Sequence, residues 1–102
     1  MNVIDNADGF LVHRAGSGGT VEIFDIAVTT ERRKGAGRKL IQELFATLDP
    51  ATRVFAITRA ENLIAQKFYE ALGFDGIPLR RFYSDDRRID AVMYIRSAGG
   101  SI

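Results

Sequence analysis

The first part of the chain alternates apolar and polar residues between short clusters of turn-forming residues. Residues 1–5 form a weak strand pattern, and the Asn, Asp and Gly at 6–9 favour a tight hairpin before the apolar residues 10–14. The small-residue cluster at 15–19 leads into a stronger strand pattern at 20–28. Strands joined by such short turns pair antiparallel, so the sequence predicts a small antiparallel meander.

After residue 31 the apolar period changes from that of a strand to that of a helix. The apolar residues of this segment form one helical stripe: Leu40, Ile41, Leu44, Phe45 and Leu48. Asp49-Pro50 ends the helix, because the proline ring disfavours helical geometry in the residue before it. Residues 53–58 then form a nearly continuous apolar strand of the kind that helices cover. Strand, helix and strand in this order predict a parallel crossover.

A second helix follows, with Asn62 in the capping position and Gly73 as the expected left-handed residue at its end. Its apolar stripe is expected at Ile64, Phe68 and Leu72.

The remaining chain has the pattern of a closing antiparallel hairpin, with strands at 79–83 and 89–95 around the turn at 84–88. Residues 97–101 are small and polar, and we expect them to be frayed.

Size and composition narrow the class of protein. The chain has 102 residues, 46% of them hydrophobic, so we expect one compact domain over residues 1–102. The formal net charge of +1 favours neither nucleic acid nor an anionic membrane as a partner. The absence of Cys excludes thiol catalysis and Cys-based zinc sites, and a single His, His13, leaves little for a metal site. Without an apolar run near the ~20 residues of a membrane span, a cytoplasmic protein is the expectation.

The segment RRKGAG at 32–37 stands between a predicted strand and a predicted helix. Its two glycines remove the Cβ atoms that would keep a ligand from the backbone, and the first amides of a helix lack intrahelical partners. Five basic residues gather around them: Arg32, Arg33, Lys34, Arg38 and Lys39. The spacing is neither that of a nucleotide P-loop nor that of a dinucleotide site. The segment therefore indicates an anion site, with a solvated basic first turn of a helix as the alternative.

Two motifs resemble those of the GNAT superfamily of N-acyltransferases. The strand residues Ile26-Ala27-Val28 followed by RRKGAG resemble the acetyl-CoA motif [RQ]xxGx[GA], and residues 62–74 resemble the second signature, NxxAxx[FL]YxxxGF. The tail at 82–93 resembles the final hairpin of many members more loosely, so the similarity covers roughly residues 1–96. The resemblance implies an α+β fold with a mixed sheet, antiparallel N-terminal strands, a central β-α-β crossover, a second helix and a C-terminal β-hairpin.

The resemblance also implies a function, acetyl transfer from acetyl-CoA to a primary amine of a small molecule or protein. Backbone amides at 33–38 would bind the pyrophosphate, the backbone of residues 26–28 would pair with the pantetheine arm, and Asn62 would contact that arm. The complete expected cofactor site is Ile26, Ala27, Val28, Arg32, Arg33, Lys34, Gly35, Ala36, Gly37, Arg38, Asn62, Phe68 and Tyr69. Asn62 can also be a helix cap, and Tyr69 can also be an aromatic residue at the edge of the core.

In the family mechanism the amine attacks the thioester directly, so no covalent enzyme intermediate is needed. A backbone N–H near Val28 would stabilise the oxyanion, and Tyr69 would protonate the departing thiolate. Glu22 is the leading candidate for the base, with Asp25 and a water chain as alternatives. Strict alternation places Glu22 on one face with Phe24, Ile26 and Val28 and Asp25 on the other, unless a bulge exchanges the faces.

Two other functions compete with catalysis. Relatives commonly begin with an extra strand and two helices that line the acceptor site, whereas about twenty residues precede Glu22 here. We therefore expect a homodimer that completes the acceptor site, and a catalytically silent CoA-binding module is the alternative function. A nucleic-acid patch at 32–39 is disfavoured by the near-zero net charge and by the lack of interleaved aromatic residues.

Overall fold

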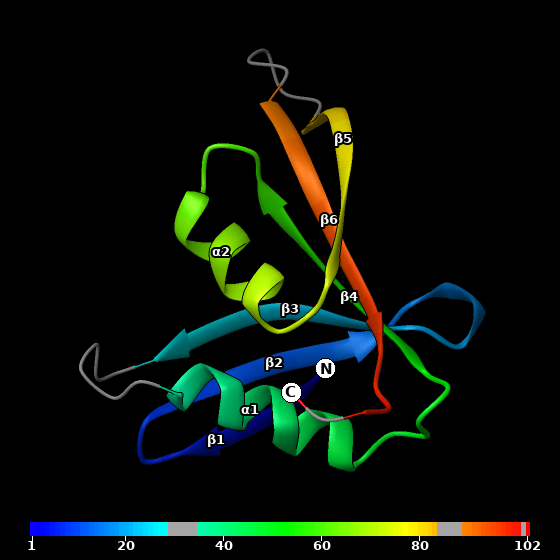
Figure 1. Ribbon diagram of the computed structural model, residues 1–102. Coiled ribbons are helices and arrows are strands. Elements are labelled where there is room, and N and C mark those ends of the chain that lie inside the picture. The colour runs from blue at the N-terminus through cyan, green and yellow to red at the C-terminus, as the bar shows by residue number, and fades with distance from the viewer. Residues whose placement is uncertain (29–34, 84–88, 101) are drawn as a thin grey trace. The chain divides into compact units, whose positions relative to one another are not determined.

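The computed structural model describes residues 1–28, 35–83, 89–100 and 102. These residues form six strands, two α-helices and a short 3₁₀ turn, η1 (Ser17–Gly19). The chain divides into two compact units: unit 1 comprises Met1–Val54 and Ser97–Ile102, and unit 2 comprises Phe55–Arg96. Figure 1 labels the elements, and each unit is described by itself below.

Unit 1 contains the predicted antiparallel meander. Strands β1 (Asn2–Asn6), β2 (Gly9–Ala15) and β3 (Val21–Val28) lie side by side in this order. Asn6 pairs with Gly9 across a two-residue loop, and the Asp8 N–H donates to the Asn6 side chain at 2.8 Å, as the turn residues at 6–9 predict.

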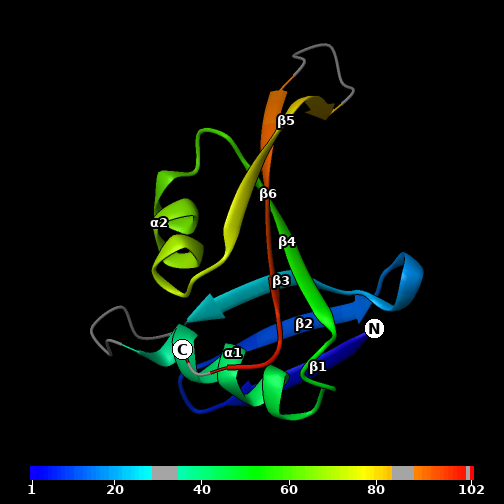
Figure 2. The ribbon, with the colours of Figure 1, turned by 45° about the vertical axis from the view of Figure 1, so that its right-hand side comes forward.

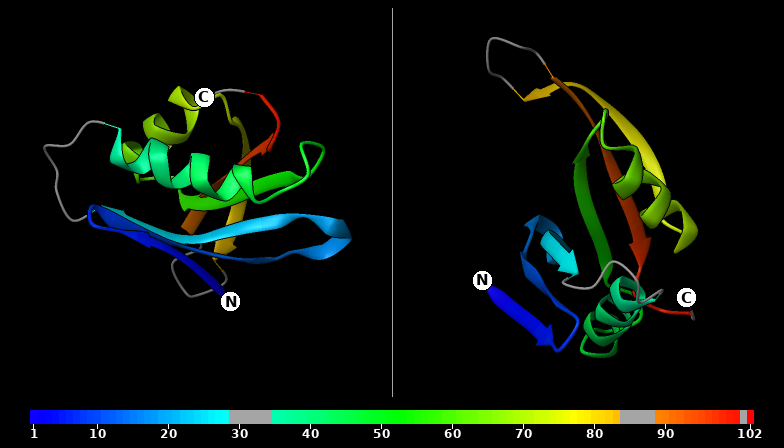
Figure 3. Two further views of the ribbon diagram at one scale, coloured as in Figure 1. Left: turned by 90° about the horizontal axis from the view of Figure 1, so that it is seen from below. Right: turned by 90° about the vertical axis from the view of Figure 1, so that its left-hand side faces the viewer.

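Helix α1 (Ala36–Ala46) follows β3 and packs along β1–β3, as Figure 3 shows. Its predicted stripe is confirmed at four positions, because Leu40, Ile41 and Leu44 are fully buried and Phe45 is 7% exposed. The fifth, Leu48, lies beyond the end of the helix and is half-buried. The helix ends at Ala46, three residues before Asp49, with Thr47 as its cap. On the sheet, Leu11 and Ile23 are the most buried side chains of β2 and β3, so these two residues mark the face that α1 covers.

Two residues of the segment expected to be frayed, Ala98 and Gly99, are held in place, whereas Ser101 lies outside the described residues. The Ala98 N–H donates to the Thr52 carbonyl at 2.8 Å, and the Gly99 N–H donates to the Pro50 carbonyl at 2.9 Å. Ala98 is buried, and a Cβ at Gly99 would lie 3.0 Å from the Pro50 ring. Small residues here allow close packing rather than disorder.

Unit 2 contains most of β4 (Arg53–Arg59), helix α2 (Leu63–Ala71) and the hairpin of β5 (Asp75–Tyr83) and β6 (Ile89–Ser97). Its strands lie in the order β4-β6-β5, and α2 packs beside β5 (Figure 2). The predicted turn at 84–88 lies outside the described residues.

Strand β5 begins at Asp75, four residues before the predicted start at 79. Gly76 and Pro78 disfavour strands in general, but Pro78 stands on an edge strand, where a missing N–H is tolerated. With these boundaries adjusted, the α+β class, the closing hairpin and the strand–helix–strand order of β3, α1 and β4 agree with the prediction.

Candidate functional site

The amino-terminal end of α1 is built by Gly35. Gly35 has a φ of +93°, a left-handed conformation that favours glycine, and the Lys39 N–H donates to its carbonyl at 2.9 Å. The amides of Ala36, Gly37 and Arg38 therefore precede the first backbone bond of the helix. Among the described residues no side chain caps this end, and its first turn has no acidic residue. Such an end suits an anion.

The basic residues expected around this end are described in part. Arg38 and Lys39 are exposed on the first turn of α1. Arg32, Arg33 and Lys34, which the sequence assigns to the same site, lie outside the described residues.

The end of β3 carries the predicted pantetheine-binding backbone. Ile26, Ala27 and Val28 pair with Leu11, Phe10 and Gly9 of β2. This pairing uses one edge of β3, so a ligand that adds a strand there must use the opposite edge. The close approach of β2 requires Gly9, because a Cβ at this position would lie 2.1 Å from the Ala27 carbonyl oxygen.

A β-bulge in β3 corrects the faces expected from strict alternation. Val12 pairs with Asp25 and His13 pairs with Ile23, so Phe24 is the extra residue of β3. Past the bulge the faces exchange. Asp25 then shares a face with Glu22, whereas Ile26 joins Ile23 on the face that α1 covers. The grouping of Glu22 with Ile26 and Val28 is therefore wrong, and the exchange that a bulge was expected to produce is present.

Glu22, the leading candidate for the base, is held by Arg14 across the β2–β3 pair. The Arg14 Nε donates to Glu22 Oε1 at 2.7 Å, and the Glu22 side chain is 16% exposed. The guanidinium also stands 4.3 Å from the centre of the Phe24 ring, which is itself half-exposed. Sequence reasoning missed Arg14, although its position opposite Glu22 follows from the register of the hairpin. Asp25, the alternative base, is exposed.

His13, the one histidine of the chain, lies on β2. Burial, together with the positive charge of the N-terminus, lowers its pKa. It pairs with Asn2 and Ile23 on neighbouring strands.

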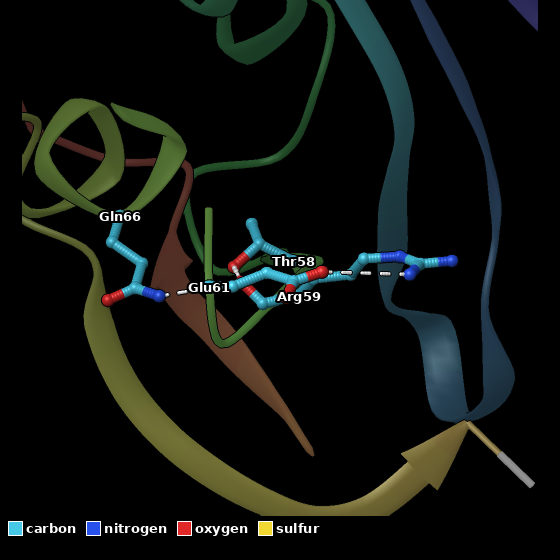
Figure 4. Close-up of polar contacts among 4 residues, drawn as sticks. All are labelled: Thr58, Arg59, Glu61 and Gln66. Carbon is cyan, nitrogen blue, oxygen red and sulfur yellow. Dashed lines mark hydrogen bonds and ion pairs between the residues drawn. The ribbon is translucent and has the colours of Figure 1, made fainter. Parts of the chain in front are cut away.

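In unit 2, Asn62 caps α2, as predicted. Its side-chain oxygen accepts a hydrogen bond from the Ala65 N–H at 3.1 Å. The turn before it is held by Gln66, whose side-chain amide donates to the carbonyls of Arg59 and Ala60 at 3.4 and 2.6 Å. Figure 4 shows this turn, including the ion pair of Arg59 with Glu61 at 3.7 Å. The cap uses only the oxygen of the Asn62 amide, so its NH₂ group is a separate donor.

Tyr69 lies in a buried aromatic cluster. It is 4% exposed, with edge-on rings of Phe68 and Phe74 at 5.1 and 5.2 Å and a nearly parallel ring of Tyr94 at 5.6 Å. The expected apolar stripe of α2 is wrong in one position, because Ile64 is 85% exposed. Tyr69 is buried on α2, Leu72 at the C-terminal cap is buried as predicted, and Phe68 is half-buried.

The predicted site residues are thus divided between the units. Unit 1 contains Glu22, the end of β3 and the start of α1. Unit 2 contains Asn62, Phe68 and Tyr69. Within the described residues no group of three or more His, Asp or Glu side chains is arranged to hold a metal. No helix of the described ranges is long and apolar enough to cross a membrane.

Comparison with known proteins identifies the family that the two sequence motifs resemble. Residues 3–74 match the model of the acetyltransferase (GNAT) family, which covers more than half of the chain. The chain belongs to this family.

Among curated proteins, the chain is 36% identical over 76 residues to the ribosomal protein bS18-alanine N-acetyltransferase of Escherichia coli K12. That alignment covers 70% of this chain and 51% of the relative, so the chain spans about half the length of the curated relatives it matches.

Among solved structures, a ribosomal-protein-S18-alanine N-acetyltransferase from E. coli matches with a TM-score of 0.70 and 25% identity, covering 97% of this chain and 68% of that one. A putative streptothricin acetyltransferase from Bacillus anthracis, in complex with acetyl coenzyme A, matches with a TM-score of 0.75 and 25% identity, covering 88% and 55%. These likenesses confirm the expected GNAT fold.

Proposed function

We propose that the protein is an acetyl-CoA-dependent N-acetyltransferase that acetylates a primary amine by direct attack. The observation that carries the proposal is the amino-terminal end of α1, which Gly35 opens within the segment that matches the family model. Amides at 36–38 and the Arg38 guanidinium would bind the pyrophosphate, with Arg32, Arg33 and Lys34 expected to add positive charge. The acetyl-CoA complex of the B. anthracis relative supports the choice of cofactor.

The remaining cofactor contacts follow from the two units. The edge of residues 26–28 that does not pair with β2 would pair with the pantetheine arm, and the NH₂ group of Asn62 would donate to one of its carbonyls. Phe68, half-buried on α2, would pack against the same arm. These contacts orient the thioester without placing a charge beside it.

The chemistry needs three groups around the thioester. The neutral amine attacks the carbonyl carbon, and the N–H near Val28 donates to the developing oxyanion. When the carbon–sulfur bond breaks, the electron pair leaves with the sulfur, and the Tyr69 hydroxyl protonates that thiolate. The amine loses its own proton to a base, so acetyl-amine and CoA thiol are the products.

For the base, Glu22 remains the leading proposal, and its ion pair sets a condition. Oε1 of Glu22 already accepts from Arg14, so we assign the proton of the amine to Oε2, directly or through water. Asp25, on the same face after the bulge, and a water chain stay as alternatives. Substitution of each carboxylate by its amide separates these choices, because only the true base loses kcat while binding of acetyl-CoA is retained.

Three further proposals concern the amine acceptor, the oligomeric state and the location of the protein. Relatives named for a ribosomal protein alanine and for streptothricin indicate that both protein and small-molecule amines are reasonable acceptors. We also propose a homodimer and a cytoplasmic location. The homodimer is supported by the exposed Phe24, on the face of β3 that carries Glu22 and Asp25. A monomeric mass by light scattering at assay concentration would count against it.

The test of the function is release of CoA thiol in the presence of acetyl-CoA and a panel of amines, including peptides that begin with alanine. Tyr69→Phe should lower kcat by about a hundredfold, as expected for the loss of a general acid, and should leave the Kd for acetyl-CoA unchanged by calorimetry. Binding of CoA without turnover on any amine would instead favour a silent CoA-binding module. Absence of CoA binding would overturn both.

A further inference from the structure

Tyr94 of β6 lies against the ring of the proposed acid. The two rings stack at 5.6 Å between centres with an angle of 22° between planes, whereas Phe68 and Phe74 meet Tyr69 edge-on, at 69° and 63°. Tyr94 is 1% exposed, so its ring has little freedom. Tyr94 is therefore the ring stacked on Tyr69, whereas the two phenylalanines meet it at steep angles.

The hydroxyl of Tyr94 is fixed by the residue next to Tyr69 in the chain. It donates a hydrogen bond to Glu70 Oε2 at 2.8 Å. Tyr69 and Glu70 are neighbours on α2, so one helix turn contacts Tyr94 at two points, its ring and its hydroxyl. A ring held at both points cannot tilt or slide without breaking one of the contacts.

Strand β5 provides the space for this ring. Gly76 stands opposite Tyr94 in the β5–β6 register. A Cβ at position 76 would lie 2.9 Å from Cε1 of the Tyr94 ring and 3.4 Å from its Cζ. The glycine therefore belongs to the same arrangement, since any larger residue would displace the ring.

The state of the Tyr94 hydroxyl agrees with a supporting role. Burial, the hydrogen bond to Glu70 and the charge of Glu70 raise the pKa of Tyr94 to about 12. At neutral pH the hydroxyl stays protonated, and its proton is committed to the Glu70 carboxylate. Tyr94 is thus unsuited to protonate a leaving thiolate itself.

We propose that Tyr94, held by Glu70 and accommodated by Gly76, is a positioning residue that fixes the ring of Tyr69 for proton donation. The inference rests on the proposed function, in which Tyr69 is the acid. Proton transfer requires the Tyr69 oxygen to lie within hydrogen-bond reach of the sulfur, and small misplacements of a catalytic group reduce rates strongly. Loss of the Tyr94 contacts should therefore lower kcat more than it changes binding of acetyl-CoA.

The experiment measures kcat and KM for substitutions at Tyr94 and Glu70, each in the wild-type and in the Tyr69→Phe background. Tyr94→Leu should lower kcat about tenfold in the wild-type background, with KM for acetyl-CoA changed less than about twofold. In the Tyr69→Phe background, which has no acid to position, the same substitution should change kcat less than about twofold. Ile77→Ala, next to Gly76 on β5, is the control for general damage to the hairpin.

Milder variants keep the test valid if Tyr94→Leu fails to fold. Tyr94→Phe and Glu70→Ala each remove the hydrogen bond between the two residues but keep the stacked ring, so each should lower kcat only about threefold. Because both variants remove the same bond, the double variant should be no worse than either. Glu70→Gln retains an acceptor and should restore kcat to near the wild-type value. Failure of this rescue would overturn the role of the Glu70 contact.

The outcomes separate the inference from the function on which it rests. Equal losses of kcat in both backgrounds would show that Tyr94 supports only the fold, which overturns the inference and leaves the acid role of Tyr69 intact. Full activity of Tyr69→Phe would overturn both the acid and its positioning. Loss confined to the wild-type background, with rescue by Glu70→Gln, is the result that establishes the proposal.

Discussion

Unit 1 offers a ligand mainly backbone groups, whereas unit 2 offers side chains. In unit 1 the proposed contacts are the amides at 36–38 and the edge of residues 26–28, both placed by glycines that allow an unusual φ or a close approach. In unit 2 they are Asn62 and Tyr69, each held by specific partners, Ala65 for the cap and three aromatic rings for the phenol. Backbone geometry positions one half of the proposed site, and side-chain packing positions the other.

The two halves should therefore respond differently to mutation. A backbone site depends on chain geometry, so it should fail when a glycine is replaced and tolerate changes at many side chains. A side-chain site should respond to the loss of a single group while the fold persists. The start of α1 and the start of α2 make the contrast direct, because the first has no side-chain cap among the described residues and the second has Asn62.

The strongest test of the backbone half is Gly9→Ala. The new Cβ would stand 2.1 Å from the Ala27 carbonyl oxygen, and a backbone atom in a paired strand cannot move away without separating β2 from β3. We expect a loss of about 3 kcal/mol in the free energy of unfolding, measured by urea denaturation. Gly18→Ala is the control: its φ is +67° but nothing lies near its Cβ, so it should lose only about 1 kcal/mol. Equal losses would mean that the approach of β2 does not constrain the end of β3.

Charge reversal tests the proposed anion site at the start of α1. Arg38→Glu places a negative charge beside the amides that are proposed to bind pyrophosphate, and should raise the Kd for CoA about tenfold at low salt. Lys67→Glu, also on an exposed helix position but on α2, should change it less than about twofold. Calorimetry at low and high salt measures both, and the effect of Arg38→Glu should shrink as salt screens the charge. Equal effects of the two variants would remove the distinction between the helices.

Asn62 allows the cap and the cofactor contact to be separated. Asp is an equally good cap, so Asn62→Asp should keep the free energy of unfolding, whereas Asn62→Ala should lose about 1 kcal/mol. Both variants lack the amide NH₂ and should therefore bind acetyl-CoA more weakly than the wild type. Tight binding by Asn62→Asp would reduce Asn62 to a helix cap and weaken the assignment of the side-chain half.

Local patterns in the sequence were sufficient for most of the fold. The stripe that includes Leu40 and Leu44, the hairpin at Asn6 and the cap at Asn62 each depend on residues close together in the chain. The boundaries failed where a residue type serves a distant neighbour. Gly76 makes room for the Tyr94 ring, yet the strand was predicted to begin only at residue 79. Gly99 packs on Pro50, yet its segment was predicted to be frayed.

The same distinction between local and distant residues applies to the candidate site. The resemblance of two short motifs selected Gly35 and Tyr69, because each motif consists of residues close together in the chain, and their roles stay predictions. It did not reveal Arg14 on Glu22, which follows from the register of the β2–β3 hairpin. Nor did it reveal Tyr94 on Tyr69, which joins a strand to a helix distant in sequence. The bulge at Phe24 likewise depends on how β2 and β3 pair, so its faces were fixed only by the observed register.

The smallest expected effect concerns the side-chain half at alkaline pH. The pKa of Tyr94 is raised from 10.0 to about 12, so the folded protein holds this proton more tightly than the unfolded chain. The contribution of this group to the free energy of unfolding is fully present below pH 10. It should be lost between pH 10 and about 12, because the unfolded chain loses the proton first. Because Glu70 is exposed and water screens its charge, the fall should be about 1 kcal/mol or less. Comparison of wild type with Tyr94→Phe by urea denaturation isolates it, since both retain the other tyrosines. A fall of the same size in Tyr94→Phe would assign it to another group, and the contact between Tyr94 and Glu70 would then contribute little to the rigidity of this half.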